Sequence, residues 1–226
     1  QGYSSAASDV YKRQDINIAK KLMDAANATG WNNVKYQKRT PELAVPEAQK
    51  SVPKSTPWGD MTYLEYKYRV EFEKPEYDII DAYCKDKGMT WSASPWDMPS
   101  LEFLLQYDVP YIKIASASNG RDEMIAEAAK SGKPVILSTG MTTMDEIDHA
   151  VEVLEKNGHG DYILMHTNSA YPAPVKDLNM RMIQTLKDRF DCLVGYSGHE
   201  ENLEPTIAAV VLGACCIERH LSLIHI

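Results

Sequence analysis

Residues 193–220, LVGYSGHEENLEPTIAAVVLGACCIERH, contain the pattern that decides the fold. They read as two short apolar strands, LVGYS and CIERH, joined by the helical segment NLEPTIAAVVLGA. A histidine follows or ends each strand, and these two histidines, His199 and His220, are 21 residues apart. A strand–helix–strand unit of this length brings both strand ends to one edge of a parallel sheet. We therefore expect the two imidazoles on the same rim.

The same alternation of strand and helix extends toward the N-terminus. Five further segments are predicted as strands, and a polar residue recurs at or next to the strand ends, at intervals of about 22 to 31 residues. Such a series of units predicts a parallel sheet with right-handed crossovers, and a (β/α)8 TIM barrel fits it better than an open sheet. No GxGxxG motif follows a strand, which disfavours a dinucleotide-binding fold. The five strands are NVKYQ (33–37), MTWSAS (89–94), YIKIAS (111–116), PVILST (134–139) and YILMHT (162–167).

Seven strands fall short of the eight that a barrel needs. We expect a barrel domain over residues 15–221 that lacks its first strand and its last helix. The polar segment 1–14 and the final residues 222–226 are expected to lie outside the fold as tails. The long Pro-rich segment 40–75 follows a strand end, where a lid over the barrel would be placed.

Composition narrows the class of protein. The chain has 226 residues, a net charge of −8 and a pI near 5.3, which disfavours nucleic acid and anionic membranes as partners. Its four cysteines form no CxxC motif, and we expect reduced thiols in a cytoplasmic protein. The longest apolar stretch, residues 207–217, is too short to span a membrane.

Two lysines are predicted to point into the barrel. Lys113 alternates with Ile112 and Ile114, and Lys35 alternates with Val34 and Tyr36, so each lysine faces away from the helices. Buried ammonium groups are costly unless an anion offsets them. We expect these lysines and the strand-end hydroxyls to form an oxyanion site suited to a phosphorylated carboxylate. The hydroxyls belong to Ser94, Ser116, Ser138, Ser169 and Ser197.

His199 and His220 are the candidate metal ligands, because imidazole is a common ligand of divalent transition metals. His166 has no evident partner in the sequence, so a structural role is at least as well supported as metal binding. Glu218 shares the strand face of His220 and could be a metal ligand, an orienting group or a buried partner of a lysine.

Seven motifs in order resemble the sialic acid synthase (N-acetylneuraminate synthase) family, over about residues 15–221. They are VKYQKRTP, WSASPWD, YIKIASAS, GKPVILSTGM, HTNSAYPAP, GYSGHE and IERH. The resemblance implies condensation of phosphoenolpyruvate with N-acetylmannosamine and water to give N-acetylneuraminate and phosphate. It also implies Mn2+, with Mg2+ or Co2+ as alternatives, and a domain-swapped homodimer in which an antifreeze-like domain, absent from this sequence, follows the barrel.

Motif by motif, the resemblance assigns roles to this chain. His199 and His220 would hold the metal, and Gln37 and Tyr171 would contact the amino sugar. Both histidines and both lysines would be catalytic. The groups that would bind phosphoenolpyruvate are Lys35, Ser94, Lys113, Ser116, Ser138, Ser169 and Ser197.

Departures and alternatives leave several points open. Some members have a glutamate where this chain has Ser118, so that glutamate's role cannot be transferred. The acceptor could be N-acetylmannosamine or a sugar used for legionaminic- or pseudaminic-type acids. A Schiff-base aldolase with Lys113 as the covalent amine is a second enzyme class. A non-catalytic sugar-binding or polysaccharide-assembly protein is the non-enzymatic alternative, and we expect the fragment alone to be inactive.

Overall fold

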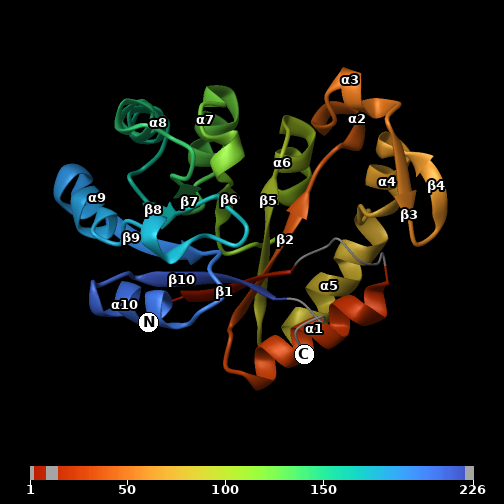
Figure 1. The fold of residues 1–226 in the computed structure, drawn as a ribbon, viewed down its shortest axis with the longest axis horizontal. Coiled ribbons are helices and arrows are strands. Elements are labelled where there is room, and N and C mark those ends of the chain that lie inside the picture. The colour runs from red at the N-terminus through yellow and green to blue at the C-terminus, as the bar shows by residue number, and fades with distance from the viewer. Residues whose placement is uncertain (1–2, 9–14, 222–226) are drawn as a thin grey trace.

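The computed structural model describes the backbone of residues 3–8 and all of residues 15–221. Its strands and helices alternate along the chain (Figure 1). The main-sheet strands are β1 (Tyr3–Ser8), β2 (Asn33–Lys38), β5 (Thr90–Pro95), β6 (Ile112–Ile114), β7 (Val135–Ser138), β8 (Tyr162–Thr167), β9 (Leu193–Gly198) and β10 (Cys216–Leu221). The helices between them are α1 (Ile16–Ala28), α5 (Lys74–Asp86), α6 (Met98–Leu104), α7 (Asp122–Lys130), α8 (Met144–Asn157), α9 (Met182–Phe190) and α10 (Glu204–Val211), with 3-10 turns at Ser116–Ser118 and Val175–Asp177.

The eight strands form one sheet in the order β5-β2-β1-β10-β9-β8-β7-β6, and every pairing along this order is parallel. The sheet curls until its outer strands, β5 and β6, lie close together. There the buried Ser92 hydroxyl donates a hydrogen bond of 2.8 Å to the carbonyl of Tyr111, next to β6. All seven strands predicted from the sequence are present, and the predicted barrel-like parallel sheet is confirmed.

We expected residues 1–14 to lie outside the fold and no strand to precede α1. For six of these residues the expectation is wrong, because they form a strand of the main sheet. Tyr3–Ser8 forms β1, which pairs with β10 on one side and with β2 on the other. A strand forms here because its backbone N–H and C=O groups pair with those of β2 and β10, which would otherwise be unpaired strand edges. The remaining parts of both expected tails (1–2, 9–14 and 222–226) lie outside the described residues, and so does the stretch after Leu221 in which we expect no final helix.

Alternation along the strands separates two layers of core. The outer layer packs β-strand side chains such as Val34, Ile112 and Ile114 against the helices. The inner layer lies inside the curled sheet and comprises the buried residues Tyr111, Ile136, Met165 and Cys216. Because side chains two residues apart share a face, Lys113 follows Tyr111 and Glu218 follows Cys216 into the interior. The inner apolar layer is thus the floor beneath the predicted polar site.

The segment after β2 is folded rather than open loop. It consists of α2 (Pro41–Ala44), α3 (Glu47–Lys50), the antiparallel hairpin β3 (Pro53–Thr56) and β4 (Gly59–Thr62), and α4 (Tyr63–Arg69). We call these elements the β2–α5 insertion. Figure 1 shows it on the side of the molecule away from α8 and α9. A capping box between Thr62 and Glu65 begins α4. In the described part of the chain, no helix is long and apolar enough to cross a membrane.

Candidate active site

Both predicted lysines lie inside the curled sheet, as expected. Lys35 and Lys113 are buried, with only 5% and 3% of each residue's surface exposed. Each lysine hydrogen-bonds a strand-end serine. The ammonium of Lys113 donates to the Ser138 hydroxyl at 2.5 Å, and that of Lys35 donates to the Ser94 hydroxyl at 3.4 Å. Four of the predicted residues, from β2, β5, β6 and β7, therefore meet at the carboxyl end of the sheet.

Glu218 is the anionic partner of both lysines. Its carboxylate lies 3.7 Å from the Lys35 ammonium and 3.9 Å from that of Lys113, and it accepts a 2.9 Å hydrogen bond from the Ser197 hydroxyl. The structure thus decides between the roles that the sequence left open, in favour of a buried partner of the lysines. Two ammonium groups and one carboxylate leave this cluster with a net charge of about +1. The remaining positive charge suits an anionic ligand.

The pKa values follow from this burial. Desolvation lowers the pKa of Lys113 to about 8, because the charged form loses its water, although Glu218 partly opposes the change. Burial alone would raise the pKa of Glu218, but the two nearby ammonium groups and the Ser197 hydroxyl bring it to about 2. The carboxylate is therefore ionised at neutral pH, and Lys113 titrates within reach of it.

Two further predicted serines, Ser116 and Ser169, lie close to Gly140 in the loop after β7. The amide of Gly140 donates to the Ser116 hydroxyl at 3.1 Å. A methyl group at Gly140 would lie 2.8 Å from that hydroxyl, and it would also collide with the hydroxyl of Ser169. Glycine at this position therefore allows two strand-end hydroxyls to approach the loop after β7. Such an arrangement of N–H and O–H groups can bind an oxyanion.

The two predicted metal ligands also meet, at the rim. The ring centroids of His199 and His220 are 5.1 Å apart. The Asn168 carbonyl accepts a hydrogen bond from His199 Nδ1 at 2.6 Å, which leaves Nε2 of that ring as the free acceptor. The Tyr171 ring stacks on His199 at 4.1 Å, and its hydroxyl hydrogen-bonds Nε2 of His220.

These imidazoles have the chemistry of metal ligands. Burial lowers the pKa of His199, and desolvation at the rim, with the nearby charge of Lys35, lowers the pKa of His220 to about 3. Both rings are therefore neutral at pH 7, which is the form that binds a divalent metal. Among the described residues, no group of three or more His, Cys, Asp and Glu side chains is placed to hold a metal.

A cavity of about 480 Å3 opens beside the histidines. It is bounded by the end of β2, by the β2–α5 insertion and by the loop that carries Tyr171. Sequence reasoning predicted three of its residues, Gln37, Tyr171 and His220, and missed those from the insertion and from the loops after β2 and β5. The missed polar and aromatic residues are Arg39, Gln49, Tyr63, Lys67 and Trp96.

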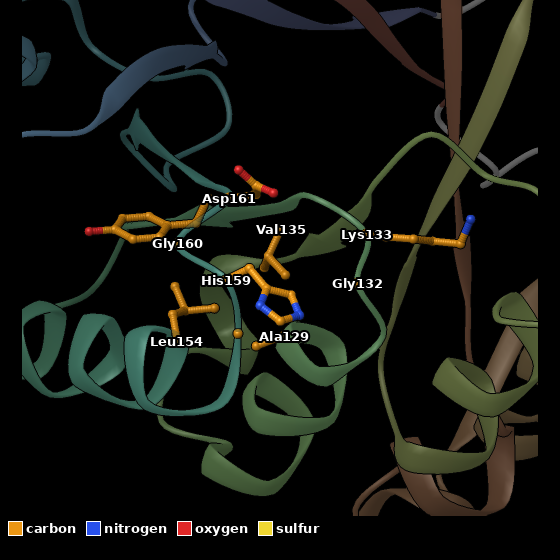
Figure 2. A pocket seen from close by; sticks show the side chains of 10 residues that line it. Ala129, Gly132, Lys133, Val135, Leu154, His159, Gly160 and Asp161 are labelled. Carbon is orange, nitrogen blue, oxygen red and sulfur yellow. The ribbon is translucent and has the colours of Figure 1, made fainter.

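Two further histidines of the described residues, His166 and His159, lie away from the rim pair. His166 is buried and its Nε2 lies 2.7 Å from the Leu178 carbonyl, so the structural interpretation fits it. A second small pocket surrounds His159 at the opposite end of the sheet, where β7 and β8 begin (Figure 2). Its volume is only about 10 Å3, which is enough for about one water molecule and not for a substrate.

Comparison with known proteins gives consistent results. Residues 22–225 match the model of the NeuB family. An N-acetylneuraminate-9-phosphate synthase of Drosophila melanogaster is 37% identical over 213 residues, which are 92% of this chain and 56% of that protein. An N,N'-diacetyllegionaminic acid synthase of Campylobacter jejuni is 32% identical, over 96% of this chain and 66% of that protein. The match therefore covers between 56% and 66% of the length of these two curated relatives.

Among solved structures, the chain is similar to an N-acetylneuraminic acid (sialic acid) synthetase from Leptospira borgpetersenii, crystallised with citrate. The TM-score is 0.87 and the identity 30%, over 98% of this chain and 73% of that one.

Proposed function

Because the chain belongs to the NeuB family, we propose that it forms the active site of an enzyme that condenses phosphoenolpyruvate with an N-acetylated amino sugar. The products would be a nonulosonic acid and phosphate. The names of two relatives, an N-acetylneuraminate-9-phosphate synthase and an N,N'-diacetyllegionaminic acid synthase, support this class of product. The observation that carries the proposal is the buried Lys35–Glu218–Lys113 cluster, with the His199/His220 pair at the rim of the same interior.

Phosphoenolpyruvate carries a carboxylate and a phosphate, and the cluster offers two ammonium groups for them. Lys113 and Lys35 would neutralise these charges, while the serine hydroxyls and the Gly140 amide region would bind the oxygens. Since the site is buried, its ammonium groups act in a low dielectric, where they stabilise developing charge more strongly than in water.

The amino sugar would occupy the 480 Å3 cavity beside the histidines. Gln37 and Tyr171 line this cavity and would orient the sugar, with its aldehyde toward the interior. A divalent metal, Mn2+ by the resemblance, would be held by His199 and His220 and would supply Lewis-acid polarisation of the aldehyde when bound. Carbon 3 of phosphoenolpyruvate would bond to the aldehyde carbon, and the aldehyde oxygen would take up a proton to become a hydroxyl. Water would add at carbon 2 and give up that proton. The bond from carbon 2 to the phosphate oxygen would then break, so that the added hydroxyl becomes the 2-keto group and its proton leaves with the released phosphate.

Three further points belong to the proposal. The curled sheet would be a TIM barrel whose final helix follows β10. The whole enzyme would be a homodimer with a second domain beyond the barrel. Its acceptor would be N-acetylmannosamine, its 6-phosphate, or a diacetamido sugar of the legionaminic type, and the two relatives named above support different members of this set.

Product analysis by mass spectrometry with this panel of sugars tests the proposal in the full-length protein. His199→Ala and His220→Ala should each lower metal-dependent turnover by roughly 1,000-fold, since Lewis-acid catalysis contributes several kcal/mol. Helix content should stay unchanged. His149→Ala is the matched control, because His149 is exposed and pairs with Asp122 on the surface. Full activity in both site variants after metal removal would contradict the proposal.

A second candidate, a Schiff-base aldolase, has one observation in its favour, the lowered pKa of Lys113. Borohydride with pyruvate would then form a stable adduct on Lys113, detectable by peptide mass spectrometry. The synthase reaction needs no covalent lysine, so it predicts no adduct. Loss of activity with a chelator would also favour the synthase.

A further inference from the structure

An ion pair between a half-buried arginine and a buried glutamate lies next to the two rim histidines in the sequence. The pair consists of Arg219, which precedes His220 in the sequence, and Glu200, which follows His199. We infer that this pair is a positioning device, which fixes the separation and orientation of the two imidazoles. The inference rests on the proposed function, in which those imidazoles hold the metal.

The strand pairing shows why such a device is needed. The paired residues of β9 and β10 run from Ile217 opposite Tyr196 to Arg219 opposite Gly198. His199 directly follows β9 and His220 follows Arg219 within β10, so both lie one step beyond the last paired position. His220 is still tied to β1 on its other side, but the described ladder does not join it to His199.

The ion pair joins the two strands at this point. The Arg219 guanidinium donates through Nη1 to the Glu200 carboxylate and through Nη2, at 2.5 Å, to the Glu200 backbone carbonyl. One side chain of β10 therefore holds both the side chain and the main chain of the residue after His199. This two-point contact uses the fixed fork of the guanidinium, which gives directional restraint that a lysine could not provide.

Surrounding groups fix the carboxylate in turn. Glu200 is only 3% exposed. Its carboxylate accepts a hydrogen bond from the Tyr196 hydroxyl at 2.8 Å and one from the Thr206 hydroxyl at 3.4 Å. Tyr196 belongs to β9 and Thr206 to α10, so the network connects the strand, the loop and the helix that enclose the His199 turn.

Gly198 allows the pair to approach the backbone. A methyl group at this position would lie 2.7 and 2.9 Å from the two carboxylate oxygens of Glu200, and it would also collide with the Arg219 guanidinium. A side chain at residue 198 would therefore displace the pair. The sequence GHE at the end of β9 and ERH in β10 thus supplies both histidines and the pair beside them.

A role in stability alone is a weaker explanation. Buried ion pairs are often no more stabilising than apolar side chains of the same size, because both charges lose their water. A pair that holds the main chain beside two candidate ligands instead orients them indirectly, one step behind the groups that hydrogen-bond metal ligands. Mutation of such groups typically costs about 10- to 100-fold in metal affinity.

The test measures Mn2+ binding without substrates in the full-length protein. We expect Glu200→Gln to raise the Kd for Mn2+ by about 10- to 100-fold, and Arg219→Lys to raise it less, because one of the two contacts can remain. Arg189→Gln is the control, since Arg189 makes a similar two-point contact with Asp148 on the surface. Its Kd should equal that of the wild type.

A second readout follows the imidazole 15N signals of His199 and His220 in the metal-free protein. We expect displaced or broadened imidazole signals in Glu200→Gln, and this result would support positioning. If the wild type bound no Mn2+, that result would count against the proposed metal chemistry, but the imidazole signals would still test the positioning. Unchanged imidazole signals in a folded Glu200→Gln variant would overturn the inference, as would wild-type Mn2+ affinity in that variant. If Glu200→Gln does not fold, Arg219→Lys decides by the same two criteria.

Discussion

Lys113 sets the charge of the proposed phosphoenolpyruvate site, so the pH dependence of the enzyme should report its titration. Its pKa is lowered to about 8 by burial, and only the protonated form attracts an anion. We predict that kcat/KM for phosphoenolpyruvate falls about tenfold per pH unit above pH 8. Lys113→Met should remove this limb and lower kcat/KM by at least about 30-fold, the cost of losing one partner of a buried charge pair.

The measurement is a pH profile from 6.5 to 9.5 with the sugar saturating. A limb that persists in Lys113→Met would assign the titration to another group. The stability of the protein should move in the opposite direction. Between about pH 8 and 10.5 the unfolded chain binds more protons at Lys113 than the folded one, so the free energy of unfolding rises with pH in that window.

Sequence reasoning predicted which side chains of this candidate site face inward, and its omissions have a clear physical origin. Alternation along a strand shows which side chains face inward, and it placed both lysines and the strand-end serines correctly. It cannot show which inward groups touch. Glu218 was therefore left with three possible roles until its distances to the two ammonium groups were known. Arg219 faces away from Glu218 and His220, so no site pattern included it.

At the scale of elements, apolar periodicity predicted those strands whose side chains pack into a core. It missed β1, because Tyr3–Ser8 (YSSAAS) is polar and small, and its place in the sheet follows from backbone pairing to β2 and β10. It also missed the β2–α5 insertion as folded structure. Proline and aromatic residues there form short elements whose contacts are aromatic and cationic, such as Arg69 over the Trp58 ring. Neither feature has the regular period that marks a helix or strand.

Helix α10 carries an apolar stripe whose exposure has a measurable consequence. Its outward residues are between 56% and 81% exposed, and they recur at the spacing of one helix face. We predict that Ile207→Lys leaves the free energy of unfolding of the 226-residue chain within about 0.5 kcal/mol, because the side chain has little to lose in solvent. Self-association should decrease, since a contiguous apolar patch promotes it. The stripe consists of Leu203, Ile207, Val210 and Val211.

Urea unfolding and sedimentation velocity on the same samples provide the two measurements. Ala209→Lys is the control on the opposite face of α10, where the side chain is fully buried, and it should unfold the chain or destabilise it by several kcal/mol. If the wild-type chain sediments as a monomer at the concentrations used, the predicted self-association is wrong.

At the scale of the whole molecule, the fold depends on how the two outer strands of the curled sheet meet. Along the rest of the sheet, neighbouring strands share ladders of backbone hydrogen bonds. β5 and β6 lie side by side without such a ladder among the described residues. A hydrogen bond from the Ser92 hydroxyl to the Tyr111 carbonyl joins them. Ser92 is fully buried, and Tyr111 in turn donates from its hydroxyl to the Asn33 side chain at 2.7 Å, inside the sheet. This contact thus connects β5, β6 and β2 beneath the lysine cluster.

We predict that Ser92→Ala lowers the free energy of unfolding by about 1–3 kcal/mol, because it leaves the buried Tyr111 carbonyl without this donor. Ser55→Ala, in the exposed hairpin strand β3, should change it by less than about 0.5 kcal/mol. Chemical unfolding of the two variants beside the wild type gives both values. The same loss should weaken phosphoenolpyruvate binding, since Lys113 lies two residues beyond Tyr111 on the inner face. Equal stabilities for Ser92→Ala and Ser55→Ala would show that the seam between β5 and β6 is held by apolar packing rather than by this hydrogen bond.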